Sequence, residues 1–281
     1  MEDKIDSELI LGELLKEESV RLRYWIHGGS IGQYTKSYER WKRTRNIVRY
    51  FLEESNRVKG RLHIIDIGCG NGLYTWLFKD ILGSRDSEIF GIDISEARIH
   101  LARRMQSRFG VRNVSFLVGD AAAGIELPAG WADIVFCGEV IEHIAEPMKC
   151  LREVYRVLKP DGTVIITTPN KNNPVLRMSR LCGAFYKQPR ERVSDLEEKD
   201  PAVFDRHVSV KGLKEWTGVF NQSGFKVGSV RRGSLFCGGS RYDRFPLFFG
   251  FILILEAILD RTPFAAAITE NLTFKLHKIQ T

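Results

Sequence analysis

Three alternating glycines follow a short apolar run in the first quarter of the chain. Residues 62–67 read LHIIDI, and Gly68, Gly70 and Gly72 come directly after them. Because glycine lacks a Cβ, such a loop can turn sharply and let a ligand approach the backbone closely. The pattern predicts a strand and then a loop that holds a nucleoside-bearing cofactor. A dinucleotide loop would have its third glycine at position 73, where this chain has Leu73, which argues against nicotinamide and flavin cofactors.

Two further carboxylates come at the ends of later apolar runs. The run 88–92 ends at Asp93, and the run 114–118 is followed by Gly119 and Asp120. In an open α/β sheet the ligand lies across the carboxyl ends of the strands, where a carboxylate accepts hydrogen bonds from both ribose hydroxyls. We therefore expect Asp93 to bind a ribose and Asp120 to lie near the exocyclic amine of adenine.

A third group of polar residues could supply catalysis. Glu139, Glu142 and His143 stand at i, i+3 and i+4, so in a helix they would share one face. Two carboxylates and an imidazole predict half of a divalent metal site, which His207 would complete, and this ligand set suits Mg, Mn, Fe or Zn. The alternative needs no metal: His143 acts as a general base, with Glu142 beside it, because a hydroxyl acceptor needs help to lose its proton.

Hydrophobic periodicity supplies the elements that must position these groups. Apolar side chains at spacings near three and four predict one helix between residues 38 and 52 and another between 148 and 158, which a turn at 159–162 ends. Strand and helix patterns alternate from 62 to 168, which predicts parallel strands with helices on both faces. The remaining predicted elements are a helix over 211–222 and strands over 225–230 and 273–278.

Five segments resemble the successive motifs of class I S-adenosylmethionine-dependent methyltransferases. They are IIDIGCGNG (64–72), GIDIS (91–95), GDA (119–121), ADIVFCGEVIEHI (132–144) and LREVYRVLKPDGTVIITTPN (151–170). The resemblance covers roughly residues 60–230 and is specific because the five motifs occur in order. In motif style it is closest to the ubiquinone-biosynthesis O-methyltransferase group and related small-molecule methyltransferases. The Glu-x-x-Glu-His element also resembles a group of RNA 2′-O-methyltransferases.

The resemblance implies a fold, a cofactor and a set of cofactor contacts. The implied fold is α/β, with a Rossmann-like, doubly wound, mostly parallel seven-stranded sheet, an antiparallel last strand and a helical cap. The implied cofactor is S-adenosyl-L-methionine. The residues predicted to contact it are Asp66, Gly68, Cys69, Gly70, Gly72, Asp93, Ile94, Asp120, Ala121, Glu139 and Tyr34.

We expect one α/β domain with embellishments. Residues 1–60 would form a helical segment that covers the cofactor site, and residues 61–170 the cofactor-binding core. Residues 171–210 would form a lid or insertion, and residues 211–281 the rest of the core with a substrate-cap insertion at 231–270. The 281 residues, 43% of them hydrophobic and 27% charged, are ordinary for a soluble globular protein.

Composition also predicts a compartment and classes of partner. The first residues lack the basic and apolar regions of a secretory signal, and the five cysteines have no C-x-x-C spacing, so we expect a cytoplasmic protein without disulfides or a zinc knot. The net charge of +7 is uneven: residues 1–18 hold seven acids and two lysines, whereas 36–49 hold six basic residues and one acid. Such basic character attracts phosphates, RNA or an anionic membrane, although it is equally common on a solvated face.

An apolar stretch at residues 245–259 bears on the acceptor. Its fifteen residues are too few to span a bilayer, which takes about twenty. It could line a pocket for a greasy substrate, lie in a membrane interface or form a dimer contact. Because it falls in the cap insertion, pocket lining is preferred, and the predicted acceptor is an oxygen on a small phenolic, lipid-like or glycoside molecule. The alternatives are a metal-dependent RNA 2′-O-methyltransferase and a cofactor-binding scaffold without catalysis.

Overall fold

The computed structural model of the chain describes three long stretches and several isolated residues. The described residues are 31–173, 208–234, 251, 254–256, 258, 259, 262 and 268–279, and for 31–41 the description is limited to the backbone. Most of the predicted lid and of the predicted cap insertion lies outside them, as do His207 and the Tyr34 side chain.

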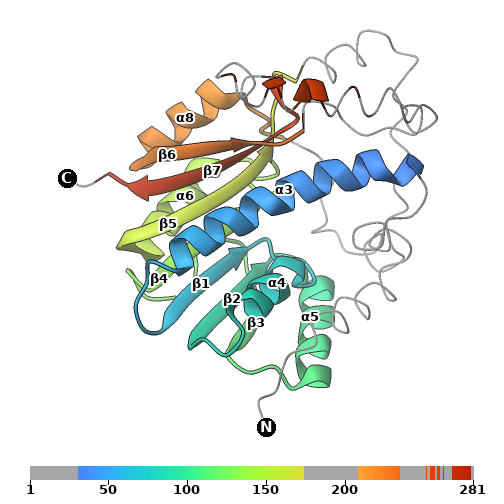
Figure 1. Ribbon diagram of the computed structural model, residues 1–281. Helices are drawn as coiled ribbons and strands as arrows, with labels where there is room; N and C mark the ends of the chain where they lie inside the picture. Colours follow the sequence, from blue (N-terminus) through green and yellow to red (C-terminus); the bar gives the residue numbers. More distant parts are fainter. Residues whose placement is uncertain are drawn as a thin grey trace.

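A seven-stranded sheet forms the centre of the molecule (Figure 1). In spatial order its strands are β3 (Val114–Val118), β2 (Ser87–Asp93), β1 (Leu62–Ile67), β4 (Ala132–Gly138), β5 (Leu158–Pro169), β7 (Asn271–Lys278) and β6 (Phe225–Arg232). The strands β1 to β5 pair in parallel, and β7 is antiparallel to both of its neighbours. The predicted mostly parallel α/β sheet with an antiparallel last strand is therefore confirmed.

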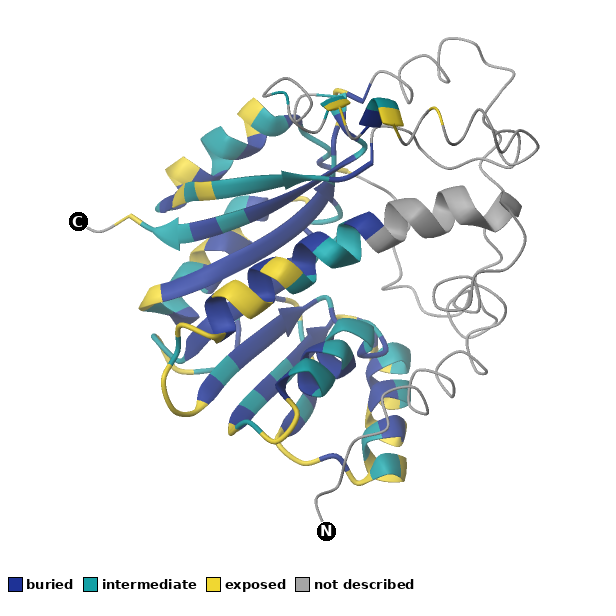
Figure 2. Ribbon diagram, in the orientation of Figure 1, coloured by how far each residue is buried: buried dark blue, intermediate teal, exposed yellow. Residues whose placement is uncertain are grey.

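In the described part of the chain, five helices cover the two faces of this sheet. One face packs against α3 (Ile31–Ser55), α4 (Leu73–Leu82) and α5 (Glu96–Phe109), and the other against α6 (Pro147–Val157) and α8 (Leu213–Gln222). Because both faces are covered, the central strands are apolar almost throughout and are buried (Figure 2). The helices are buried on the side that faces the sheet and exposed on the other, as their periodicity predicts.

The start of β5 differs from the sequence prediction. The segment 159–162, predicted as a turn between a helix and a strand, belongs to β5, which begins at Leu158. The pairing with β4 shifts here, since Ala132 lies opposite Leu158 while Ile134 lies opposite Thr163. The residues expected to form a turn are instead an irregularity within the strand pair, and the turn prediction is wrong.

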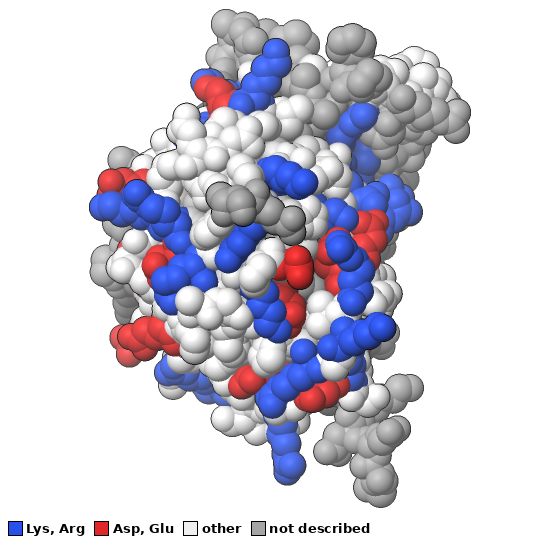
Figure 3. Space-filling view, turned by 90° about the vertical axis from the view of Figure 1, so that its left-hand side faces the viewer, with Lys and Arg blue, Asp and Glu red and all other residues white. Residues whose placement is uncertain are grey.

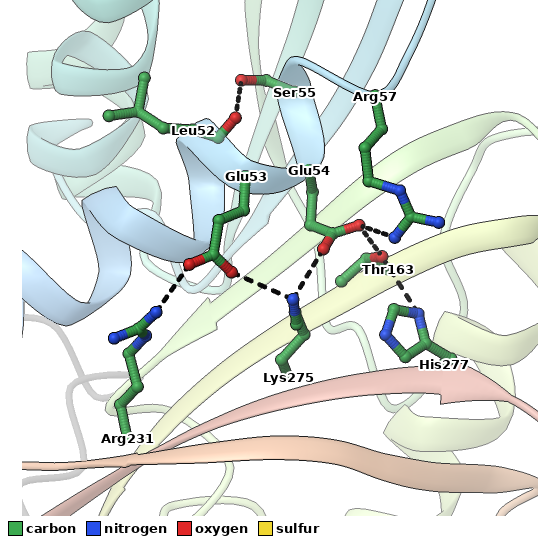
Figure 4. A network of polar contacts seen from close by, with 9 residues as sticks. All are labelled: Leu52, Glu53, Glu54, Ser55, Arg57, Thr163, Arg231, Lys275 and His277. Atoms are coloured by element: carbon green, nitrogen blue, oxygen red, sulfur yellow. Dashed lines mark hydrogen bonds and ion pairs between the residues drawn. The ribbon is translucent and has the colours of Figure 1, made fainter.

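Helix α3 crosses the sheet with its carboxyl-terminal end near the first residues of the parallel strands (Figure 1). Ion pairs and hydrogen bonds hold this end, and they involve Glu53, Glu54, Arg57, Thr163, Arg231, Lys275 and His277 (Figure 4). The Lys275 ammonium lies 3.1 Å from Glu53 and 2.9 Å from Glu54, and the Thr163 hydroxyl donates to Glu54 at 2.9 Å. We call this set of residues the anchor network.

The face in Figure 3 lies at the end of the sheet where the parallel strands begin. Its Lys and Arg side chains are spread over the surface, with Asp and Glu side chains between them. Several of these opposite charges are paired, including Arg61 with Glu88 and Lys159 with Asp133. The basic excess of the chain therefore does not gather into one patch on this face.

Candidate functional site

The glycine loop between β1 and α4 is held by backbone contacts that need glycine. Gly68, Gly70 and Gly72 have φ values of 67°, 57° and 93°, the left-handed region that favours glycine. The Gly68 N–H donates to the Ile92 carbonyl at 2.7 Å, which ties the loop to the end of β2. A Cβ on Gly68 would collide with the Val140 side chain. The glycine at 68 is therefore required both by the backbone angle and by the contact with the segment after β4.

Asp93, at the end of β2, connects this loop to the next helix. Its Oδ2 accepts a hydrogen bond from the Gly70 N–H at 2.8 Å, and its Oδ1 accepts one from the Ser95 N–H at 2.9 Å. Ser95 in turn caps α5 by accepting from the Arg98 N–H. Backbone donors on both sides thus fix the Asp93 carboxylate at the carboxyl edge of the sheet, where a ribose would be bound.

A cavity of about 540 Å³ opens along this edge of the sheet. The ends of β1 to β4 and the residues that follow them supply its walls. Among the residues predicted to bind the cofactor, those that line it are Gly68, Asp93, Ile94, Asp120, Ala121 and Glu139, and His143 lines it as well. Ile94 is 49% exposed, a large fraction for an isoleucine, and therefore offers the cavity an apolar surface.

Asp120 contributes to the same wall from the end of β3. Its Oδ1 accepts a hydrogen bond from the Ala122 N–H at 2.8 Å, and this bond closes a local turn. The carboxylate is thereby held beside Gly119 and Ala121, which also line the cavity. The structure thus places Asp93, Ile94 and Asp120 on one side of a single cavity, as the sequence order of the strands predicts.

Other predicted contact residues lie behind the wall. Asp66 is buried in β1 and accepts a hydrogen bond from the Thr75 hydroxyl at 2.6 Å. Burial raises the pKa of Asp66 to about 7, and the nearby charge of Asp93 adds to the shift. Asp66, Cys69, Gly70 and Gly72 are absent from the cavity lining. Their direct contact with a cofactor stays a prediction, and in this structure they support the loop.

Glu139 follows β4 directly and adopts a backbone conformation that is uncommon outside glycine. Its φ is 57°, and its N–H donates to the Thr167 carbonyl at 2.9 Å. Its carboxylate lies 2.9 Å from the Arg43 guanidinium and accepts a hydrogen bond from the Asn271 amide at 2.5 Å. An unusual conformation that is fixed from several sides is typical of functional sites.

Arg43 is a residue that the sequence analysis missed. It comes from α3 and brings a positive charge to the carboxylate of Glu139 in the cavity wall. Arg43 precedes the fully buried Ile47 and Tyr50 by four and seven residues, so it lies on the helix face that packs against the sheet. A cation in an otherwise apolar stripe is the signal that could have identified it.

The segment 139–143 is not helical, and the predicted shared face is wrong. Residues 141–143 form a turn, and α6 begins only at Pro147. The left-handed conformation of Glu139 cannot start a helix, whereas proline is favoured in a first helical turn. Within the described residues, no group of three His, Cys, Asp or Glu side chains is arranged to hold a metal ion, and His207 lies outside those residues.

Glu142 and His143 occupy different environments. Glu142 is fully buried, and its backbone carbonyl accepts hydrogen bonds from the Val208 and Ser209 N–H groups. Burial raises the pKa of Glu142 to about 9, and the charge of Glu139 adds to the shift. His143 lines the cavity, and its Nε2 lies 4.0 Å from Glu142 Oε1. The His143 imidazole can therefore contact a ligand in the cavity. The Glu142 carboxyl group does not line the cavity, and its raised pKa keeps it protonated at neutral pH.

The sheet order, the glycine loop and the acidic residue after β2 define a nucleoside-binding α/β domain of the class I methyltransferase type. Residues 59–224 match the family model described as a methyltransferase domain, and the chain belongs to this family.

Curated relatives match over part of their length. A ubiquinone biosynthesis O-methyltransferase of Pseudomonas aeruginosa (strain LESB58) is 33% identical over 136 residues, which are 48% of this chain and 56% of the relative. The enzyme of the same name from Pseudomonas putida (strain GB-1) is 30% identical over the same shares. The match thus spans only about half the length of these curated relatives.

Solved structures match more of the chain at lower identity. A SAM-dependent methyltransferase from Aquifex aeolicus has a TM-score of 0.53 and 17% identity, with 98% of this chain and 100% of that chain covered. The [4+2]-cyclase SpnF has a TM-score of 0.54 and 19% identity, with 84% and 81% covered. These likenesses confirm the fold, and the second one indicates that the fold also serves another reaction.

Proposed function

We propose that this protein transfers the methyl group of S-adenosylmethionine to an oxygen atom of a small phenolic, lipid-like or glycoside acceptor. The observation that carries the proposal is the cavity in which Asp93, Ile94 and Asp120 lie along one side and Glu139 along the other. The family match supports methyl transfer, and the oxygen acceptor rests on the relatives named O-methyltransferase.

The residues around the cavity fit the parts of this cofactor. Asp93 would accept hydrogen bonds from the two ribose hydroxyls, and Ile94 offers an apolar surface to the adenine ring. Asp120 would lie near the adenine amine. Arg43 and Glu139, an ion pair at the cavity wall, carry the charges that complement the carboxylate and ammonium groups of the methionine part. When bound, the cofactor supplies an already activated methyl group, so the protein has mainly to align the acceptor and exclude water.

His143 is the proposed general base. It lines the cavity and would take the proton of the acceptor hydroxyl on a ring nitrogen. Glu142 Oε1 lies 4.0 Å from the His143 Nε2, beyond hydrogen-bond distance, and the raised pKa of Glu142 keeps this carboxyl group uncharged at neutral pH. Replacing His143 with alanine should lower kcat by about 100-fold, within the usual range for a general base, and leave cofactor binding nearly unchanged.

A divalent metal is the second candidate for activating the acceptor. The observation that favours it is the burial of Glu142, whose two carboxyl oxygens have no well-formed hydrogen bond in the described part of the chain. The carboxylate of Glu139 is close enough to raise the pKa of Glu142. Stripping with EDTA separates the two mechanisms. Full activity after stripping would exclude the metal, whereas loss that Mg²⁺ or Mn²⁺ restores would replace the general-base mechanism.

Two other functions remain as alternatives. An RNA 2′-O-methyltransferase is supported by the basic excess and the Glu-x-x-Glu-His element. A scaffold without catalysis is supported only by the general rule that one fold can serve different functions. Among the described residues no helix is long and apolar enough to cross a bilayer, and contact with a membrane surface stays a prediction.

Incubation with methyl-labelled cofactor tests the proposal. Catechols, quinols, phenolic glycosides, lipid extracts and short RNAs would be offered separately to the wild-type protein and to the His143→Ala variant. We expect label on one of the small-molecule classes, strongly reduced in the variant. Label on RNA, with binding that weakens by orders of magnitude between low and moderate salt, would overturn the proposed acceptor.

A further inference from the structure

An ion pair between Lys42 and Glu256 joins two parts of the chain that are far apart in sequence. The Lys42 ammonium lies 3.0 Å from Glu256 Oε1, and the two side chains are only 3% and 1% exposed. Lysine and glutamate are rarely buried to this extent unless they are paired. Lys42 comes from α3, whereas Glu256 belongs to the predicted cap insertion, of which residues 254–256, 258 and 259 are described here and are called the cap segment. The pair therefore fixes this short segment against α3.

A second contact on the same helix face strengthens the link. Asn46 follows Lys42 by one helical turn and donates to the Arg232 carbonyl at 2.8 Å. The Arg232 guanidinium then donates to the Leu259 carbonyl at 3.3 Å. One face of α3 thus contacts both the end of β6 and the cap segment. We call Lys42, Asn46, Arg232 and Glu256 the clasp.

The residue next to Lys42 forms an ion pair with a residue of the cavity wall. Arg43 projects from the adjacent face of α3 and pairs with Glu139 at 2.9 Å, and Glu139 lines the cavity. Lys42 and Arg43 share a backbone in one rigid helix, so a shift of α3 that breaks one ion pair moves the other. The clasp and the cavity wall are therefore mechanically connected through one turn of helix, although neither Lys42 nor Glu256 lines the cavity.

We propose that the clasp is a positioning contact for cofactor binding: when Glu256 of the cap segment is paired with Lys42 and Asn46 holds the end of β6, α3 keeps Arg43 against Glu139, and the cavity binds the cofactor tightly. The inference rests on the proposed function, because it takes the cofactor to occupy this cavity. It assigns Lys42 and Glu256 an effect on the cofactor that neither residue exerts by direct contact. It also makes the seating of the cap segment a determinant of cofactor affinity.

Calorimetric titration with S-adenosylhomocysteine, the demethylated cofactor, tests this coupling. Glu256→Gln removes the negative charge with which Lys42 pairs and should weaken binding by about tenfold, within the range of couplings between contacting groups. Asn46→Ala is a milder change to the same face and should weaken binding by about threefold. It keeps the test decisive if the Glu256 variant folds poorly.

The matched control is Glu54→Gln, which breaks a similarly buried ion pair of the same helix. Glu54 is 5% exposed and pairs with Lys275 at 2.9 Å, in the anchor network at the carboxyl-terminal end of α3. This variant should lower the melting temperature and leave the affinity for S-adenosylhomocysteine within twofold of wild type. An equal loss of affinity in the Glu54 variant would mean that general loosening of α3 is responsible, and would overturn the proposal.

A double-mutant cycle identifies the route of the effect. If the clasp acts through the Arg43–Glu139 pair, Glu256→Gln should cost almost no further affinity in a Glu139→Gln background. Additive losses, or an affinity of Glu256→Gln within twofold of wild type, would refute the inference. Failure of the wild-type protein to bind S-adenosylhomocysteine would instead refute the proposed function, so the two failures are distinguishable.

Discussion

Ion pairs form at the middle of α3 and at its carboxyl-terminal end, but only those at the middle include a residue that lines the cavity. At the carboxyl-terminal end, the anchor network joins the helix to β5, β6 and β7 where the parallel strands begin (Figure 4). Near residue 42 the clasp and Arg43 join the same helix to the cap segment and to Glu139. An ion pair on α3 therefore does not by itself indicate a functional role. That role depends on whether one of the paired residues lines the cavity.

The two regions also shift the pKa values of their buried carboxyl groups in opposite directions. In the anchor network, burial would raise the pKa of Glu54, but hydrogen bonds from Lys275 and Thr163 outweigh it and lower the pKa. At the cavity, burial and the charge of Glu139 raise the pKa of Glu142 to about 9. In the anchor network, hydrogen-bonded partners keep Glu54 ionised. Beside the cavity, burial without such partners keeps Glu142 protonated.

The largest expected effect comes from the glycine loop. Gly68→Val should abolish measurable binding of S-adenosylhomocysteine, because a Cβ at this position collides with Val140 and the residue has a positive φ. Gly60→Ala is the control, since Gly60 has a φ of 81° but a Cβ added there would have no neighbour within 4 Å. It should cost about 1 kcal/mol of stability, the cost of the left-handed conformation, and leave calorimetric affinity unchanged. Retained binding in the valine variant would contradict the assignment of the loop.

The anchor network should affect stability and not binding. Lys275→Met removes the ammonium from Glu53 and Glu54 and should destabilise the fold by about 2 kcal/mol, because Glu54 is left buried with a charge that has lost its strongest partner. Urea denaturation gives the free energy of unfolding, and calorimetry on the same sample gives the affinity. A loss of affinity larger than twofold would remove the distinction between the two regions.

The protonated Glu142 predicts a pH dependence of stability. Its pKa in the folded protein is about 9, above the ordinary value of 4.5, so the folded state binds more protons between these pH values and stability falls as pH rises. Glu142→Gln should flatten this fall in melting temperature between pH 5 and 9, most clearly above pH 7. The buried Asp66 has a pKa of about 7, so in this variant the melting temperature would still decline as pH rises toward 7. Glu146→Gln, at an exposed site, is the control, and an unchanged slope in the Glu142 variant would contradict the assignment.

The smallest expected effect concerns the adenine side of the cavity. Ile94→Ala removes an apolar surface that is 49% exposed in the protein alone, so the fold should lose little stability. A bound adenine would lose part of its apolar contact, and the affinity for S-adenosylhomocysteine should fall by about fivefold. Calorimetry beside a thermal melt separates the two quantities. Unchanged affinity would place the adenine elsewhere.

The sequence predicted the sheet well because its elements follow from local pattern. Alternating strand and helix patterns determine a parallel sheet, and in such a sheet Asp93 and Asp120 must meet at one edge. The arrangement of residues 139–143 could not be predicted, because the left-handed conformation of Glu139 depends on hydrogen bonds to Thr167 and Asn271. Arg43 was missed for a similar reason, since its partner lies 96 residues away in the chain.

The proposed metal site illustrates the same limit. Spacing alone suggested a shared helical face for Glu139, Glu142 and His143. In the structure Glu139 forms an ion pair with Arg43, and Glu142 is buried. His207, like the Tyr34 side chain, lies outside the described residues, so its contribution stays a prediction. The domain boundaries at 60, 170 and 210 and the cytoplasmic location also stay predictions.

Titration of S-adenosylhomocysteine into wild-type protein and into Asp93→Ala measures whether the cavity binds the cofactor through this carboxylate. Asp93 holds the glycine loop through Gly70 and faces the cavity, so its carboxylate should contribute both to loop geometry and to ribose binding. We predict a dissociation constant in the micromolar range for wild type and a loss of at least about 100-fold in the variant, as expected for a buried charge-assisted contact. No binding by the wild type, or undiminished binding by the variant, would contradict it.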